Sequence, residues 1–86
     1  MPEISRFFGI VIQMYFDEHG PAHFHASYAG KWARIIVHPV GLLSGDLPPR
    51  VLALTVEWAK IHEAELLENW QRLRSNLPAL PISPLE

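Results

Sequence analysis

The sequence predicts an α+β fold, in which a small antiparallel sheet of three or four strands packs against a C-terminal helix or two helices. Two observations carry this prediction. Apolar residues alternate with a period of two in the first half of the chain, and an apolar stripe with helical spacing runs through the second half. Because 86 residues leave room for only one core, we expect a single domain over residues 1–86.

Alternating apolar residues and turn signals predict three strands, over residues 8–16, 23–28 and 31–38. The dipeptide Ala29-Gly30 separates the last two, and a two-residue loop that contains glycine predicts a tight hairpin. Counting outward from this turn pairs His25 with Arg34. A short fourth strand is expected around residues 42–43, between glycine and proline residues.

The pleat of the predicted hairpin divides its side chains between two faces. One face is mostly apolar and is expected to point into the core, with Phe24, Ala26, Tyr28, Ala33, Ile35 and Val37. The opposite face collects the polar and chemically active residues, with His23, His25, Ser27, Trp32, Arg34 and Ile36. The sequence therefore predicts one structural face and one functional face.

A helical region is predicted over residues 47–76, with Asp46 as its N-cap and Pro48 and Pro49 in its first turn. At 100° per residue it presents one broad apolar stripe, made of Val51, Leu52, Thr55, Trp58, Ala59, His62, Leu66, Trp70, Leu73 and Leu77. One continuous helix and two helices that bend near His62 both fit this pattern.

The C-terminal residues 77–86 are predicted to form an extended tail, because prolines recur at three-residue intervals, at Pro78, Pro81 and Pro84. Apolar side chains can pin this tail to the domain, namely Leu80, Ile82 and Leu85. Leu54 and Ile61 lie beside the helical stripe and widen its apolar surface. Contact with another chain, including a homo-oligomer, is therefore one expectation.

Composition excludes several classes of protein. With 49% apolar residues and a formal net charge of -2, the chain is neither intrinsically disordered nor covered by the basic field that non-specific nucleic-acid binding needs. No apolar segment approaches the roughly 20 residues of a membrane span, and the N-terminal residues do not resemble a secretory signal. The absence of cysteine fits the reducing cytoplasm, where we expect this protein.

Three of the five histidines, His19, His23 and His25, lie within seven positions. Histidine changes charge near neutral pH and is the commonest metal ligand, so three interpretations of this cluster stay open. In the first, the rings simply pack and form hydrogen bonds on the sheet. The other two histidines are expected to be structural, with His62 facing the core and His38 at a surface strand end.

The second interpretation is metal-independent cleavage of RNA through its own 2′-hydroxyl, which needs a general base, a general acid and a cation for the phosphate charge. His23 and His25 are the predicted acid–base pair, and the guanidinium of Arg34 is predicted to clamp the phosphate. Tyr15 or Ser27 is expected to assist. This hypothesis depends on the predicted hairpin register.

The third interpretation is a site for a divalent metal such as zinc. His23 and His25 project from one face of a strand, and His19 closes the site from the preceding loop, over residues 17–22. Asp17 or Glu18 then adds a carboxylate. The ribonuclease interpretation, in contrast, needs no cofactor.

Several motifs resemble the prokaryotic family called domain of unknown function 4160. They cover nearly the whole chain: Pro2-Glu3-Ile4-Ser5-Arg6-Phe7, Gly9-Ile10, Met14-Tyr15, His19-Gly20-Pro21-Ala22-His23-Phe24-His25-Ala26, Gly45-Asp46-Leu47-Pro48, Glu57-Trp58, Glu65-Leu66 and Asn69-Trp70. The His-Phe-His-Ala core is the most specific of them. Pro21-Ala22 stands where the family commonly has two prolines.

This resemblance implies a small cytoplasmic protein, often encoded beside a member of the family called domain of unknown function 2442. Such pairs resemble toxin–antitoxin modules, in which this chain is the toxin and the neighbouring protein its antitoxin. The family has no settled catalytic residues to transfer. The roles given to His23, His25, Arg34 and Tyr15 therefore rest on the residues themselves.

Together these observations predict a toxin-like protein that binds an antitoxin and acts on RNA as a metal-independent ribonuclease. The alternative is a non-enzymatic protein-interaction module, with or without the histidine-rich metal site. RNA and a protein are the expected partners, and a membrane is not.

Overall fold

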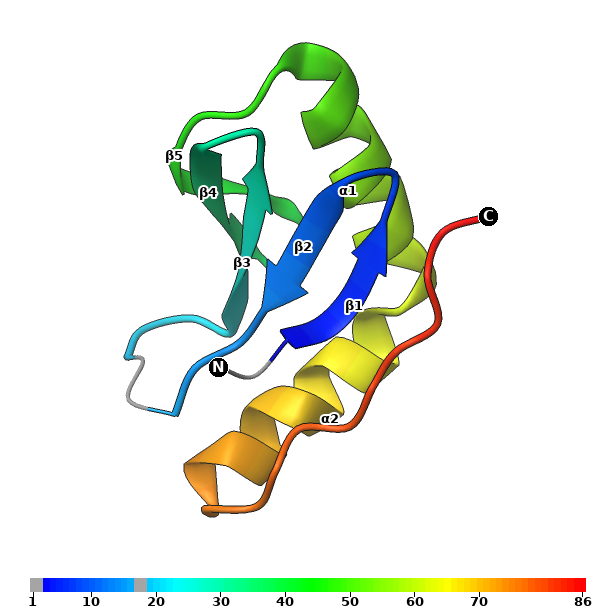
Figure 1. Cartoon of the computed structure of the whole chain (residues 1–86). Helices are drawn as coiled ribbons and strands as arrows, with labels where there is room; N and C mark the ends of the chain where they lie inside the picture. The colour runs from blue at the N-terminus through cyan, green and yellow to red at the C-terminus, as the bar shows by residue number, and fades with distance from the viewer. Residues whose placement is uncertain (1–2, 17–18) are drawn as a thin grey trace.

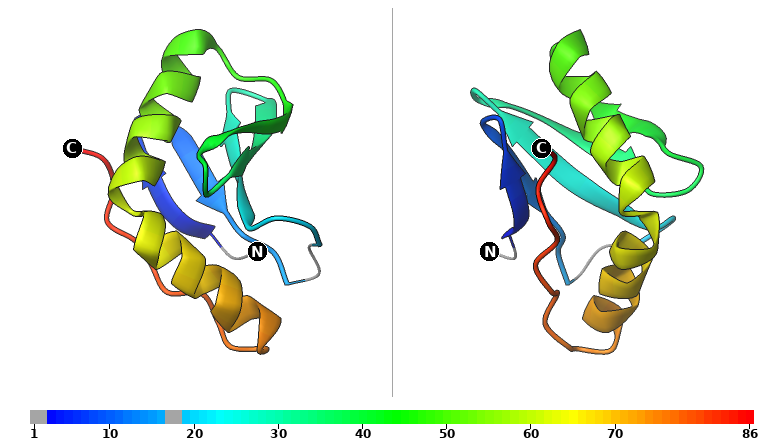
Figure 2. Two further views of the ribbon diagram at one scale, coloured as in Figure 1. Left: turned by 180° about the vertical axis from the view of Figure 1, so that it is seen from behind. Right: turned by 90° about the vertical axis from the view of Figure 1, so that its right-hand side faces the viewer.

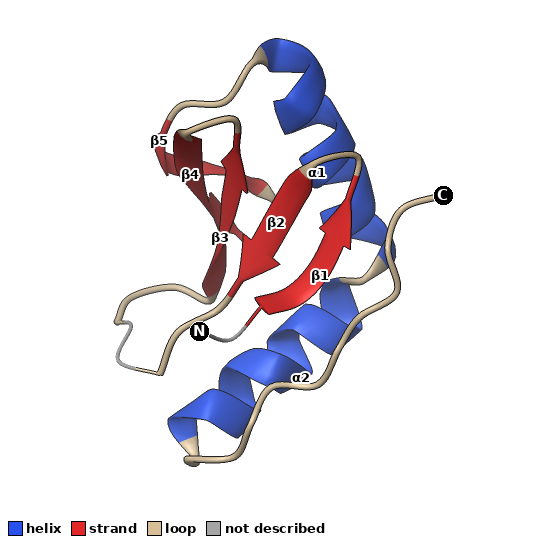
Figure 3. Cartoon of the chain, viewed as in Figure 1, coloured by secondary structure: helices blue, strands red, loops and turns tan. Residues whose placement is uncertain are grey.

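The computed structural model describes residues 3–16 and 19–86. A five-stranded antiparallel sheet is followed by two helices, which confirms the predicted α+β class (Figure 1). The strands lie across the sheet in chain order: β1 (Glu3–Phe7), β2 (Ile10–Gln13), β3 (His23–Tyr28), β4 (Lys31–Ile36) and β5 (Gly41–Gly45). The helices, α1 (Pro49–Ile61) and α2 (Glu63–Arg74), run along one side of the sheet (Figures 2 and 3).

The predicted strand over residues 8–16 is corrected by the structure. β2 covers only its middle, and a separate strand that sequence reasoning missed, β1, precedes it. The backbone explains the difference, because Phe8 and Gly9 have φ angles of 50° and 79°, in the left-handed region that turns the chain back on itself. A bulky aromatic residue rarely occupies such a position, so the alternation of apolar residues hid the turn.

The hairpin of β3 and β4 has the predicted register, which pairs His25 with Arg34 and continues from His23–Ile36 to Tyr28–Lys31. Ala29 and Gly30 both have positive φ angles, of 49° and 83°, and form its two-residue turn. β4 ends at Ile36 instead of residue 38 because the chain turns over residues 37–40. The short strand expected around residues 42–43 is β5.

Two helices occupy the region predicted over residues 47–76, which confirms the two-helix alternative. The helical backbone is interrupted at His62, with φ -109° and ψ 27°. Pro48 is the N-cap of α1 and no side chain caps it, so Asp46 does not have its predicted role. Pro49 opens the first turn, because its ring already holds the helical φ. Within the described residues, neither helix is long and apolar enough to cross a membrane.

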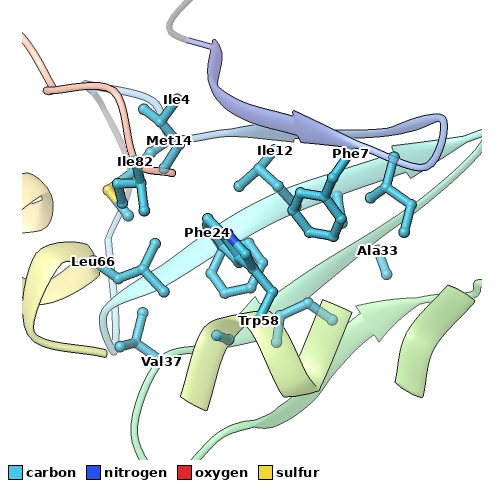
Figure 4. Close-up of a cluster of buried hydrophobic side chains, with 14 of the residues drawn as sticks. Ile4, Phe7, Ile12, Met14, Phe24, Ala33, Val37, Trp58, Leu66 and Ile82 are labelled. Carbon is cyan, nitrogen blue, oxygen red and sulfur yellow. The ribbon is translucent and has the colours of Figure 1, made fainter. Parts of the chain in front are cut away.

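The core lies between the sheet and the helices, with the indole of Trp58 at its centre (Figure 4). The Trp58 ring lies 5.3 Å from Phe7 of β1 and 5.7 Å, edge-on, from Phe24 of β3. Further members come from every layer: Ile4, Ile10, Ile12, Met14, Ala26, Ala33, Ile35, Val37, Leu47, Val51, Ala59, Leu66, Trp70, Leu73 and Ile82. The predicted apolar face of the hairpin is therefore the inner face of the sheet.

The tail over residues 77–86 is extended, as predicted, and follows α2 and then β1 (Figure 1). Ile82 is buried, and its N–H donates to the carbonyl of Ile4 at 2.8 Å. The side-chain amide of Asn69 forms two hydrogen bonds to the backbone of Leu80. Nδ2 donates to the Leu80 carbonyl at 2.9 Å, and Oδ1 accepts from the Leu80 N–H at 2.8 Å. The tail thus ties α2 to the edge strand β1.

Candidate functional site

A line of polar side chains crosses all five strands on the outer face of the sheet. The strand register joins them in the order Glu3, Gln13, His25, Arg34 and Ser44. Residues that pair directly across antiparallel strands have Cβ atoms about 4.5–5.5 Å apart, so the line is continuous. We call these five residues the polar row. Its members are partly or fully exposed, whereas Ala26 and Ala33, on the opposite face, are fully buried.

His25 lies at the centre of the polar row and is half-buried. The ring of Tyr15, which follows β2, meets the imidazole edge-on with ring centroids 4.6 Å apart. The Tyr15 hydroxyl donates to Oε1 of Gln13 at 2.8 Å, so the phenol is bonded to a member of the polar row. The structure therefore brings three of the predicted site residues together: His25, Arg34 and Tyr15.

Arg34 is oriented by its neighbour in the polar row. Its Nε donates to Oγ of Ser44 at 2.7 Å. That contact uses one of the five N–H donors of the guanidinium and leaves the four on the two Nη nitrogens. No ion pair involves Arg34 in the part of the chain that the structure describes. The polar row can therefore present a forked cation to an anionic ligand.

His23 is placed differently from the prediction, because only 1% of its surface is exposed. Its ring lies 5.2 Å from Trp70 of α2 and 5.7 Å from His25. Nδ1 lies 2.8 Å from the carbonyl oxygen of Pro21, which can only accept, so Nδ1 carries the proton and donates it. His23 therefore supports the His25 ring from within the protein and is shielded from a substrate.

The predicted metal trio is not assembled by the structure. Among residues 3–16 and 19–86, no three His, Cys, Asp or Glu side chains lie close enough together to hold an ion. His19 is exposed in the loop before β3, whereas His23 is enclosed by α2. Asp17 and Glu18, the carboxylates that the metal interpretation added, lie outside the described residues.

A second row flanks the polar row toward the hairpin turn. The register places Val11, Ser27 and Trp32 side by side on β2, β3 and β4. The indole of Trp32 is 53% exposed. We call the polar row and this second row together the outer face, which combines a cation, an imidazole and an exposed aromatic ring.

Charge at the end of the outer face is balanced locally. The guanidinium of Arg6 forms two hydrogen bonds to the carboxylate of Glu3, at 2.8 and 3.1 Å. This contact lowers the pKa of the Glu3 carboxyl and raises that of Arg6. With Glu3 paired to Arg6, the guanidinium of Arg34 supplies the permanent charge at the centre of the row.

The two remaining histidines lie away from the outer face. His38 is exposed, and its Nδ1 lies 3.1 Å from a carboxylate oxygen of Glu63. His62 is partly buried at the break between the helices, with its ring 5.4 Å from Trp58 and its Nδ1 bonded to Glu65. His62 therefore faces the core as expected, whereas His38 lies on the surface in the turn after β4 and not at a strand end.

Comparison with known proteins defines the family. The family model described as Domain of unknown function (DUF4160) matches residues 9–71, which is most of the chain. The chain belongs to the DUF4160 family. No curated protein and no solved structure matches it. The matched DUF4160 region includes every member of the polar row except Glu3.

Sequence reasoning missed three members of this DUF4160 polar row: Glu3, Gln13 and Ser44. Gln13 carries a signal, because it is the one polar residue between Ile10 and Met14. Ser44 carries none, since its pairing with Arg34 depends on an irregularity in the ladder between β4 and β5. Glu3 belongs to a strand that was not predicted.

Proposed function

We propose that this DUF4160 protein binds single-stranded RNA on its outer face and cleaves it without a metal ion. The observation that supports the proposal is the polar row, in which the partly exposed His25 pairs across the strands with Arg34. Trp32 adds an exposed ring on which a base can stack. The net charge of -2 gives the protein no general attraction for RNA, so binding depends on this local arrangement.

The proposed reaction assigns a task to each group. The His25 imidazole takes the proton from the 2′-hydroxyl, whose oxygen forms a bond to phosphorus as the bond from phosphorus to the 5′ oxygen breaks. The Nη nitrogens of Arg34 donate to the non-bridging oxygens, where negative charge accumulates. The Tyr15 hydroxyl turns from Gln13 and gives its proton to the departing 5′ oxygen. Proton exchange with water then restores both side chains.

The biological setting comes from the resemblance to toxin–antitoxin pairs. In this proposal the chain is the toxin, and a neighbouring antitoxin silences it by covering the outer face. An exposed tryptophan beside a row of polar side chains is a typical anchor for a protein partner. In this proposal Trp32 stacks on RNA in the free protein and contacts the antitoxin in the complex.

The test is cleavage of a labelled single-stranded RNA by the purified protein in excess chelator. We expect fragments that end in a 2′,3′-cyclic phosphate, and we expect His25→Ala to slow their formation at least about a hundredfold. The matched control is His38→Ala, which removes an exposed histidine far from the row and should leave the rate unchanged. Equal rates for His25→Ala and the unaltered protein would refute the proposal.

The burial of His23 supports a second candidate, a protein-interaction module without catalysis. Because His23 is buried, His25 is the one histidine of the predicted acid–base pair that is partly exposed on the outer face. The predicted pair is therefore incomplete. If expression arrests growth while RNA stays intact, and Trp32→Ala both relieves the arrest and weakens the complex with the neighbouring protein, this candidate replaces the ribonuclease.

A further inference from the structure

A cavity of about 270 Å³ lies on the helix side of the sheet, away from the outer face. It opens where the turn between β1 and β2 meets the first turns of α1. Its lining is mostly apolar and consists of Phe8, Ile10, Tyr28, Arg50, Val51 and Leu54. Apolar concave sites with a few converging polar groups are the usual form of small-ligand sites.

Two of the lining residues carry polar groups, Tyr28 with its phenol and Arg50 with its guanidinium. In the described part of the chain, Arg50 forms neither a side-chain hydrogen bond nor an ion pair, and the first turn of α1 contains no acidic residue. The Tyr28 ring rests against Gly9, where an added Cβ would lie 3.4 Å from Cε1. A phenol and a cation that forms no ion pair within the described residues therefore belong to residues that border the apolar space.

Phe8 lines the cavity, and its backbone is in an unfavourable conformation. Its φ of 50° is a conformation that suits glycine or asparagine, and its side chain is 60% exposed. The turn would form more readily with a small residue, and the ring stays largely exposed although it meets Phe7 edge-on, with ring centroids 6.3 Å apart. An aromatic ring held at the mouth of an apolar cavity gains contact area when a ligand fills it.

We infer that this cavity binds a small apolar carboxylate. The apolar body of the ligand lies against Phe8, Ile10 and Leu54, and its carboxylate accepts hydrogen bonds from Arg50 and the Tyr28 hydroxyl. The volume suits one aromatic ring with a short side arm and is below the usual range for drug-sized ligands. A free metabolite and the C-terminal phenylalanine of a peptide offer the same chemistry.

The test is titration of the full isotope-labelled chain, followed by NMR, with 3-phenylpropionate and with its neutral amide. We expect saturable shifts confined to the residues around the cavity for the carboxylate, with the amide at least roughly tenfold weaker. Arg50→Gln should weaken the binding of 3-phenylpropionate by a similar factor. Arg74→Gln, which changes an exposed arginine beside Trp70, is the matched control and should not.

Phe8→Gly separates binding from folding. Glycine relieves the strained backbone, so the variant should melt at a higher temperature and yet lose most of its affinity for phenylpropionate. A third titration uses a short peptide that ends in phenylalanine with a free carboxylate. Tighter binding of the peptide identifies a protein partner as the source of the ligand, and tighter binding of phenylpropionate identifies a metabolite.

The inference fails if neither phenylpropionate nor the peptide gives saturable shifts at the cavity. It also fails if the amide binds as well as the carboxylate, or if Arg50→Gln binds like the unaltered protein. These outcomes are independent of RNA cleavage, because no residue of the polar row lines the cavity.

Discussion

At the scale of single residues, His23 and His25 show that neighbouring side chains determine how exposed a histidine ring is. Both side chains come from β3, two positions apart, and their rings are neighbours. His23 packs against Trp70 of α2 and is buried, while His25 stays partly exposed within the polar row. One imidazole is therefore buried in the packing between β3 and α2, and the other lies partly exposed on the outer face.

This contrast predicts that two alanine substitutions destabilise the protein to different extents. His23→Ala leaves a void against Trp70 and removes the hydrogen bond to Pro21, so we expect a loss of about 2 kcal/mol in the free energy of unfolding. His25→Ala removes a half-exposed ring and should cost less than about 1 kcal/mol. Urea denaturation followed by circular dichroism measures both. If His25→Ala unfolds the protein, the ring serves packing instead of chemistry.

The chemical half of the site was predictable because it depends on local geometry. Ala29-Gly30 sets the hairpin, and the hairpin alone places His25 opposite Arg34. The enclosure of His23 was not predictable in the same way. It depends on where α2 begins and on which of its side chains reaches the end of β3, and both follow from packing between elements distant in the chain.

At the scale of elements, β5 depends on one glycine. Gly45 has φ 85°, and a Cβ added there would lie 2.5 Å from the carbonyl oxygen of Trp32 and 2.7 Å from the Cα of Ala33. Because both are backbone atoms, neither can move without shifting β4. The absence of a Cβ at Gly45 lets β5 approach β4 this closely. The approach keeps Ser44 opposite Arg34.

Gly45→Ala should therefore destabilise the fold by more than about 2 kcal/mol, since it adds a backbone clash to an unfavourable φ. Gly30→Ala is the matched control, because Gly30 has a similar φ of 83° but no atom within 4 Å of an added Cβ. It should cost only the conformational part, about 1 kcal/mol. Equal losses of stability in the two variants, measured by urea denaturation, would contradict a clash at Gly45.

Elements were predicted well where apolar periodicity agrees with backbone conformation. β3, β4 and the helical region followed from such patterns, whereas β5 was expected from the glycine and proline residues around it. The turn at Phe8 and the irregular pairing after Glu3 did not, because each contradicts the local preference of its residues. As a result β1 was missed, and with it one end of the polar row.

At the scale of the whole molecule, the C-terminal tail is the strap that joins the layers. It bonds to β1 through Ile82, to α2 through Leu80, and to α1 through the carbonyl of Ser83, which accepts from Nε1 of Trp58 at 2.8 Å. The strap also covers the backbone of β1, an edge that would otherwise be open to other strands.

Removal of residues 78–86 should cost more than about 3 kcal/mol, because it strips Ile82 from the core and leaves the Trp58 indole and the Asn69 amide without their partners. A lower melting temperature, or loss of the cooperative transition, is the expected result in a thermal scan. Ser83→Ala is the control, since only the backbone carbonyl of Ser83 takes part. An unchanged melting temperature after truncation would show that the strap is dispensable.

The order of the strands has a consequence for how the chain assembles. Each strand pairs with the one that precedes it in the chain, so the sheet closes through a series of short reversals and never waits for a distant segment. Sheets dominated by neighbouring contacts cross their folding barrier sooner than those that must close long loops. During synthesis each strand can pair as it emerges, and the segment that joins the layers follows after the helices.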